Sequence, residues 1–270
     1  MSRIMLGGLL TIAAVLCGKP TLAAEAVDRT LEAADCSERL APPRAEDVDA
    51  PVLVLVERNP WAMVIGSDEP RFALYRNGLA IYRTRDGFRQ VMLDDARAGE
   101  LTKAVNPGAL ACLETRYSTS PAFDLPSEHL FFGRGGALSG ISVDGPIDRE
   151  GRAKVPAVLA QAYDHLADFD DPKAAPWTPE FVEVMIWPYD YAPEPSIVWP
   201  SKWPGMRDPK TAKRGENAYS LYVPWRDYEA LRAFLKTRRE KGAVEIDGKK
   251  WSVELRFPFP HEPDWLTPKG

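Results

Sequence analysis

Cysteine, histidine and long apolar runs are all scarce in this sequence. Only 3 of the 270 residues are cysteine and 3 are histidine. His129, His165 and His261 lie far apart, so they lack the close spacing of a zinc site. Later apolar runs, such as residues 51–56, have the length of strands and are too short to cross a bilayer. The sequence therefore predicts no metal site and no membrane segment beyond its N-terminus.

The sequence motifs of nucleophilic catalysis and of dinucleotide binding are also missing. In the glycine-rich stretch 133–145, neither Ser139 nor Ser142 has glycine at both flanking positions of a nucleophile elbow. The same glycines lack the spacing, and the following helix, of a dinucleotide site. A strand turn is the simpler interpretation of this stretch. We therefore expect no catalytic residue and no cofactor.

Acidic residues leave one question open. The cluster at 168–172 lacks the glycine and the distal glutamate of a calcium-binding loop. A sequence does not reveal which carboxylates converge in space, so an acid–base pair is still possible. The carboxylates singled out on that ground are Glu128, Asp144 and Asp148.

The charge balance also limits the partners. Acidic residues number 39 against 34 basic ones, a formal net charge of −5. Nucleic acids and anionic membranes attract basic surfaces, so the sequence predicts neither as the main partner. The one basic run, residues 236–242, either holds an anion or complements the C-terminus of the preceding helix, and the second reading already explains it.

The N-terminus has the pattern of a signal peptide. Arg3 precedes an apolar segment, residues 4–16, that is too short to span a bilayer. Small residues then favour cleavage after Ala23. The alternative is a lipoprotein anchored through Cys17, but that processing needs a small residue where Leu16 stands. We expect residues 1–23 to be removed, leaving a periplasmic or secreted protein with no integral membrane segment.

Two cysteines remain after that cleavage. Cys36 and Cys112 form an even pair in an oxidising compartment, which favours a disulfide. The bridge would close a loop of about 76 residues and stabilise the fold by roughly 4 kcal/mol on the chain-entropy model. A reactive thiol would need cationic neighbours or a helix N-terminus, whereas Cys112 lies in an apolar run.

Periodicity predicts an α+β fold, mainly antiparallel sheet with about three packed helices. Expected strands cover 52–58, 61–67, 111–118, 129–134, 138–145, 181–187, 219–223, a meander over 71–93 and a hairpin over 243–257. Expected helices cover 95–105, with Asp94 as the cap, 155–169, with Leu159 and Leu166 on the buried face, and 225–240. The Asn77-Gly78 pair in the meander predicts a type I′ hairpin turn. The expected organisation is an extended arm over 24–50, a first α+β half over 51–148 and a second over 149–270. The alternative is that the two halves form one continuous domain.

Residues 172–209 contain 9 of the 25 prolines and 4 of the 8 tryptophans. Proline removes a backbone hydrogen-bond donor and fixes φ, so much of this stretch cannot pair in a sheet. A flexible linker would not carry so many tryptophans, so we expect an ordered, stiff loop region. Its rings either pack in the core or present a binding surface. The candidate binding residues are Trp187, Trp199, Trp203, Lys202 and Arg207.

These observations favour an exported binding protein without catalytic activity. Its partner would be another protein of the cell envelope, as for an inhibitor or an immunity protein. The alternative is an envelope hydrolase that uses paired carboxylates on glycan or peptide.

Overall fold

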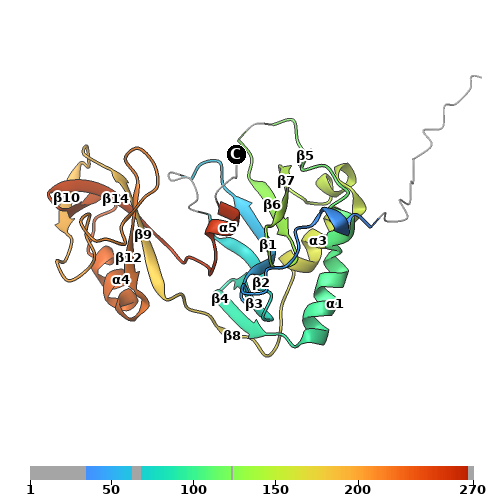
Figure 1. Ribbon diagram of the computed structural model, residues 1–270. Helices are drawn as coiled ribbons and strands as arrows, with labels where there is room; N and C mark the ends of the chain where they lie inside the picture. The colour runs from blue at the N-terminus through green and yellow to red at the C-terminus, as the bar shows by residue number, and fades with distance from the viewer. Residues whose placement is uncertain (1–34, 63–67, 123, 267–270) are drawn as a thin grey trace, which may run out of the picture. The chain divides into compact units, whose positions relative to one another are not determined.

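The computed structural model describes residues 35–62, 68–122 and 124–266 (Figure 1). The predicted signal peptide, Cys17 and most of the strand expected at 61–67 lie outside these residues. Within the described part, no helix is both long and apolar enough to cross a bilayer.

The first sheet has eight strands and is antiparallel except for the pair β5–β7. In spatial order its strands are β5 (Arg116–Ser118), β7 (Ser139–Asp144), β6 (Ser127–Phe132), β1 (Pro51–Arg58), β2 (Pro70–Tyr75), β3 (Leu79–Thr84), β4 (Gly87–Met92) and β8 (Ala175–Pro176). The meander expected over 71–93 is confirmed as β2, β3 and β4. The strand expected over 111–118 is wrong in its first part, because residues 111–115 form the turn that follows helix α2 and only Arg116–Ser118 is a strand.

The hairpin turns differ from the prediction in one respect. A type I′ turn needs a positive φ at both central residues. In the turn at residues 77–78 only Gly78 has one, at 87°. The Gly78 amide donates to the Tyr75 carbonyl, and the Asn77 side chain accepts from the Leu79 amide. The predicted turn type is found instead at Asp247 and Gly248, with φ of 50° and 77°.

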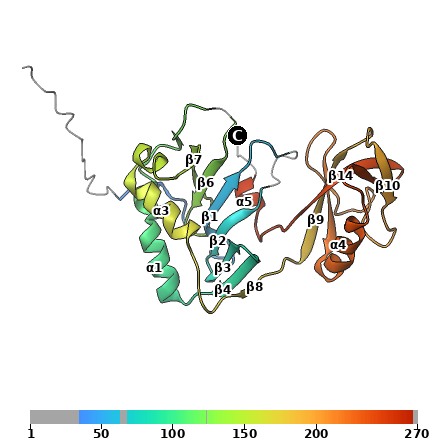
Figure 2. The ribbon, with the colours of Figure 1, turned by 180° about the vertical axis from the view of Figure 1, so that it is seen from behind.

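Helices α1 (Asp95–Val105) and α3 (Ala157–Ala167) pack against each other and cover one face of this sheet (Figures 1 and 2). The Asp94 side chain accepts from the Arg97 amide at 2.8 Å and caps α1, as expected. Asn106 ends α1 in the left-handed region. The expected core face of α3 is confirmed, since Leu159 and Leu166 are both buried.

A disulfide joins Cys36 to Cys112, with their Cα atoms 5.3 Å apart. The Cys36 amide also donates to the Gly108 carbonyl in helix α2 (Pro107–Leu110). Leu40 then enters the core beneath the first sheet. The predicted bridge is thus confirmed, and it holds the arm against the helical layer.

The second sheet has six strands. In spatial order they are β10 (Glu194–Val198), β13 (Gly242–Ile246), β14 (Lys249–Arg256), β9 (Phe181–Pro188), β12 (Tyr219–Pro224) and β11 (Ala212–Lys213). Only β10–β13 is parallel. Helix α4 (Tyr228–Lys236) packs on this sheet through buried Leu231. The two sheets and their helices confirm the α+β class.

The chain passes from the first sheet to the second between β8 and β9. Helix α3 therefore belongs with the first sheet, although the first half was expected to end at residue 148. The chain after β14 then returns to the opposite face of the first sheet, where it ends in α5 (Pro263–Leu266). Phe259 and Trp265 are buried there with Val54, Ile81 and Phe88.

A buried ionic network joins these parts. Arg256 of β14 is fully buried and donates to Glu183 of β9 at 2.8 Å, to Glu262 at 2.6 and 2.8 Å, and to the Asp68 carbonyl. Arg214 pairs with the second oxygen of Glu183. Burial opposes the charge on Arg256, but Glu262 and Glu183 outweigh it and raise the pKa of Arg256. The network fixes the C-terminal segment against β9 and β14.

Candidate functional site

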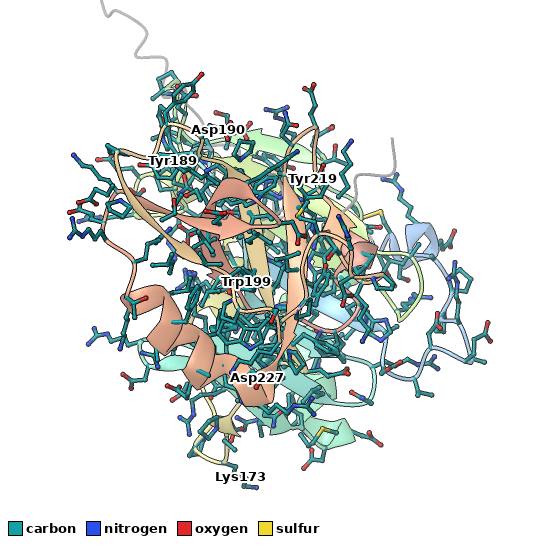
Figure 3. The ribbon with its side chains drawn as sticks, turned by 90° about the vertical axis from the view of Figure 1, so that its left-hand side faces the viewer. Lys173, Tyr189, Asp190, Trp199, Tyr219 and Asp227 are labelled. Atoms are coloured by element: carbon teal, nitrogen blue, oxygen red, sulfur yellow. A yellow bond between two sulfur atoms is a disulfide. The ribbon has the colours of Figure 1, made fainter. Side chains whose placement is uncertain are left out.

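Four of the five predicted binding residues line one open pocket of about 590 Å³. They are Trp199, Lys202, Trp203 and Arg207, and we call this the Trp199 pocket. The segment between β10 and β12 supplies one wall. The end of β12 with the short 3-10 helix that follows it (Trp225–Asp227), and the end of β13 with the turn into β14, supply the rest. Figure 3 labels two of its lining residues, Trp199 and Asp227.

The local sequence accounts for the shape of this wall. Trp199 and Trp203 each precede a proline, which disfavours helical backbone at both positions. The Trp199 amide donates to the Glu245 carbonyl at 2.9 Å and continues the pairing of β10 with β13. The Trp199 indole Nε1 donates to the Pro204 carbonyl at 3.0 Å. These bonds hold the segment 199–204 as a rigid loop.

The two indoles are core residues. Trp199 is 7% exposed and Trp203 is 5% exposed, with ring centroids 5.1 Å apart. Both rings meet Phe234 of α4 edge to face. The packed alternative left open by the sequence is therefore the one observed, and the rings form the pocket wall instead of protruding from it. Trp187 lies half-buried on β9 and does not join the other four.

The pocket rim is charged. Lys202 lies over the Trp203 ring, with Nζ 5.1 Å from its centroid. Arg207 and Arg226 are exposed, and neither side chain has a hydrogen bond or ion pair with any described residue. Arg226 was not predicted from the sequence, because the chain reversal that brings α4 beside residue 207 leaves no local signal.

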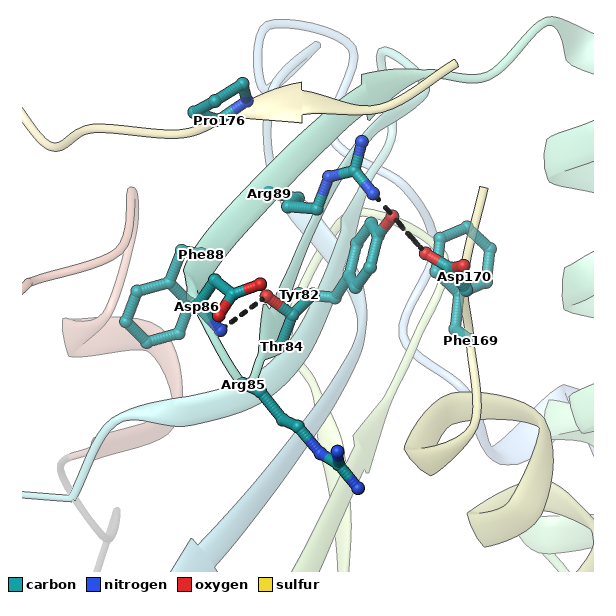
Figure 4. A pocket seen from close by; sticks show the side chains of 9 residues that line it. All are labelled: Tyr82, Thr84, Arg85, Asp86, Phe88, Arg89, Phe169, Asp170 and Pro176. Atoms are coloured by element: carbon teal, nitrogen blue, oxygen red, sulfur yellow. Dashed lines mark hydrogen bonds and ion pairs between the residues drawn. The ribbon is translucent and has the colours of Figure 1, made fainter. Parts of the chain in front are cut away.

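A second pocket of about 580 Å³ lies beside the β3–β4 turn (Figure 4). We call it the Tyr82 pocket. The Tyr82 hydroxyl donates to Asp170 at 2.9 Å, and Arg89 pairs with the same carboxylate at 3.9 Å. Arg89 also donates to the Ala174 carbonyl. Tyr82, Arg89 and Asp170 thus bind one another, and Arg85 and Asp86, which also line the pocket, carry opposite charges.

A third group surrounds Glu128, which the sequence singled out only as one carboxylate among several. Glu128 stands directly opposite Glu57 in the β1–β6 pair. Tyr163 of α3 donates its hydroxyl to Glu128 Oε1 at 3.2 Å, and Arg71 donates to the Tyr163 oxygen at 3.2 Å. Glu128 Oε2 is buried and has no hydrogen-bond partner among the described residues. Burial, reinforced by the charge of Glu57, raises the pKa of Glu128 to about 7.

The strand pattern contains a signal for this burial. Leu130 and Phe132 of β6 face the helices and are buried, so alternation places Glu128 on the same face. The other two carboxylates do not join it. Asp144 bonds to Arg116 at 2.8 Å, and Asp148 accepts from the backbone at the start of the next turn.

Ser127 and His129 lie on the opposite face of β6, and their side chains are 2.8 Å apart. Burial lowers the pKa of His129 to about 4. A catalytic histidine is oriented by a carboxylate, but the nearby Asp144 accepts from Arg116 instead. The contact therefore lacks the third member of a catalytic triad.

Among the described residues, no three histidine, cysteine or acidic side chains gather in the manner of a metal site. The Trp199 pocket is thus the place where most predicted site residues meet. The chain matches no model of a protein family, no curated protein and no solved structure.

Proposed function

We propose that this chain is an exported binding protein without catalytic activity, and that it binds another protein of the cell envelope through the Trp199 pocket. An inhibitor, or an immunity protein that neutralises an envelope-directed toxin, would act in this way. The single observation that carries the proposal is the gathering of Trp199, Lys202, Trp203 and Arg207 in one open pocket.

The pocket has the physical properties of a protein-binding surface. Its indole wall is held by packing against Phe234 and by backbone hydrogen bonds, so little conformational entropy is lost when a partner docks. Its rim carries arginine, which is enriched at the centres of protein interfaces. Exposed Arg207 and Arg226, whose side chains have no hydrogen bond or ion pair with the described residues, also leave charge available for a partner.

A pull-down from periplasmic extract tests this proposal. The wild-type chain is expected to retain one stoichiometric partner, whereas a chain with Lys202→Glu and Arg207→Glu retains much less. The matched control carries Lys236→Glu and Arg239→Glu, which change the charge equally outside the pocket. If the wild-type chain retains no partner, the proposed function is wrong.

The proposed location has its own test. Removal of residues 1–23 on export predicts that the purified periplasmic protein begins at Ala24. Intact-mass measurement checks this directly. A lipid adduct on Cys17, or a retained N-terminal segment, would contradict it.

One observation favours the alternative of an envelope hydrolase. The Glu128 carboxyl, with a pKa of about 7, stands opposite Glu57, which pairs with Arg83 at 3.5 Å. A protonated acid beside an ion-paired carboxylate is the arrangement that general acid–base hydrolysis needs. Turnover of cell-wall glycan or peptide that disappears in a folded Glu128→Gln variant would favour this function over binding.

A further inference from the structure

We infer that Glu128 is a pH-sensitive latch on the end of helix α3. While its carboxyl is protonated, Arg71 holds the last turn of α3 against the first sheet. When the carboxyl ionises, it attracts Arg71 and weakens that hold. The segment that follows α3 carries Phe169 and Asp170, which line the Tyr82 pocket, so the latch also controls one wall of that pocket. This regulation lies in the first sheet and goes beyond the proposed binding function.

Two carboxylates face each other in the sheet, because Glu57 of β1 stands directly opposite Glu128 of β6. The Glu57 side chain is 40% exposed and pairs with Arg83, whereas Glu128 is 9% exposed. Like charges directly opposite on neighbouring strands repel, and a buried carboxylate loses its hydration. This geometry favours a protonated Glu128 beside an ionised Glu57. The charged and titratable groups that act on Glu128 are Glu57 of β1, Arg71 of β2, Arg83 of β3 and Tyr163 of α3.

A chain of polar contacts connects the Glu128 carboxyl to α3. The Tyr163 hydroxyl donates to Glu128 Oε1 at 3.2 Å, and Arg71 donates through Nη1 to the Tyr163 oxygen at 3.2 Å. Nη2 of the same guanidinium donates to the Ala167 carbonyl at 3.1 Å. Ala167 is the last residue of α3, so its carbonyl has no partner within the helix. Arg71 therefore satisfies the end of α3 while it lies close to Glu128.

The end of α3 depends on this cation. Cations stabilise the C-terminal end of a helix, and anions there oppose the helix dipole. Asp168 follows α3 directly and is exposed, so its charge is unfavourable at this place. His165 is exposed in the same turn and adds a positive charge only when it is protonated. Loss of Arg71 would leave the last turn with an unsatisfied carbonyl beside an unfavourable carboxylate.

An ionised Glu128 competes for Arg71. Glu128 Oε2 is buried and has no hydrogen-bond partner among the described residues, and a buried anion needs a donor more than a neutral carboxyl does. Hydrogen bonds between a guanidinium and a carboxylate are also stronger than those to neutral acceptors. Arg83 is already paired with Glu57 at 3.5 Å. Arg71, whose acceptors in α3 are both neutral, is therefore the arginine that moves.

The last turn of α3 leads into the wall of the Tyr82 pocket. Phe169 packs edge to face on Phe72 and on Tyr82, with ring centroids 5.0 Å apart in both pairs. Asp170 accepts from the Tyr82 hydroxyl at 2.9 Å, and Figure 4 shows Phe169 and Asp170 beside Tyr82. Because these residues follow Ala167 so closely, opening of the last turn loosens this wall.

Linkage gives the sign of the pH dependence. Opening of the last turn lifts Tyr163 from Glu128, so that water reaches the carboxyl and its pKa returns towards the ordinary value of 4.5. In the closed turn, burial and the charge of Glu57 raise the pKa of Glu128 to about 7. Between these two values the open turn releases a proton that the closed turn retains, so opening becomes easier as the pH rises from 4.5 to 7.

Hydrogen exchange of backbone amides in the full mature chain, at pH 5 and pH 7 and corrected for intrinsic exchange rates, tests the latch. The Asp168 amide donates to the Asp164 carbonyl at the end of α3, and the Asn106 amide donates to the Thr102 carbonyl at the end of α1. Both amides lie at helix ends, where exchange proceeds through local opening. Protection of the Asp168 amide should fall by about tenfold or more between pH 5 and pH 7, and that of the Asn106 amide by less than about twofold.

Two variants separate the parts of the latch. Glu128→Gln stays neutral, so protection of the Asp168 amide should agree within about twofold at the two pH values. His165 is present in both chains, so its titration does not explain the difference between them. Arg71→Gln should lower protection of the Asp168 amide by about tenfold already at pH 5 and leave the Asn106 amide unchanged.

Three results would overturn the inference. The first is the same pH dependence in the wild-type chain and in Glu128→Gln. The second is an equal loss of protection at the Asp168 and Asn106 amides, because that would indicate a general loss of stability. The third is unchanged protection of the Asp168 amide in Arg71→Gln, because Arg71 would then not hold the last turn.

Discussion

The ionisation of Glu128 makes stability depend on pH near neutrality. Its pKa in the folded chain, about 7, lies above the ordinary value of 4.5 because the side chain is buried near Glu57. Below pH 4.5 the carboxyl is protonated in both states, and the stabilisation is fully present. As the pH rises towards 7, the unfolded chain releases this proton while the folded chain retains it, so stability is lost.

We therefore predict that Glu128→Gln, which imitates the protonated carboxyl, stabilises the protein at pH 8 by about 3 kcal/mol and has little effect at pH 4.5. Urea unfolding at the two pH values measures the difference. Exposed Glu216 provides the matched control, and Glu216→Gln should change stability by less than about 0.5 kcal/mol at either pH. Equal effects of Glu128→Gln at both pH values would contradict the assignment.

At the scale of elements, α3 shows that a periodic pattern predicts which residues of a helix are buried. Its apolar residues recur at helical spacing, and the sequence correctly places Leu159 and Leu166 in the core. We predict that Leu159→Ala lowers stability by about 2–5 kcal/mol, through lost transfer energy and a residual cavity. Gln161→Ala, on the exposed side of the same helix, should cost less than about 0.5 kcal/mol. Similar losses in both variants would show that the face is wrongly assigned.

The C-terminal segment shows what such patterns miss. Arg256 lies in a strand whose periodicity is readable, but nothing nearby in the sequence indicates that Glu183 and Glu262 neutralise it. We predict that Arg256→Met lowers stability by about 3–5 kcal/mol, because Glu262 is left buried without its cation and Glu183 keeps only Arg214. A thermal melt measures the loss.

The triple variant with Arg256→Met, Glu183→Gln and Glu262→Gln is the control for that explanation. It removes the stranded charges and should recover part of the stability. If the triple variant is less stable than Arg256→Met alone, stranded charge is not the cause of the loss.

The same contrast explains how much of the site was predictable. Trp199, Lys202, Trp203 and Arg207 lie within nine positions of one another, so composition alone marks them as a group. Whether the rings are buried depends on Phe234, which lies about thirty residues further on and packs against both. Arg226 and Asp247 reach the pocket from other segments for the same reason. Local patterns identify elements and clusters, whereas contacts between distant segments decide exposure and pairing.

At the scale of the whole molecule, the Cys36–Cys112 disulfide closes a loop with a sequence separation of 76 residues, which contains β1 to β4 and α1. Cross-linking so long a loop restricts the unfolded chain more than the folded one, since the folded arm is already held by the Cys36 amide bond and by Leu40 in the core. We predict that the double variant Cys36→Ser and Cys112→Ser keeps the wild-type far-ultraviolet spectrum but loses about 2–5 kcal/mol of stability. Denaturant unfolding of the oxidised wild-type chain, the reduced wild-type chain and the variant measures this. The reduced chain and the variant should have the same unfolding midpoint, below that of the oxidised chain. Equal midpoints for all three proteins would show that the bridge contributes nothing to stability.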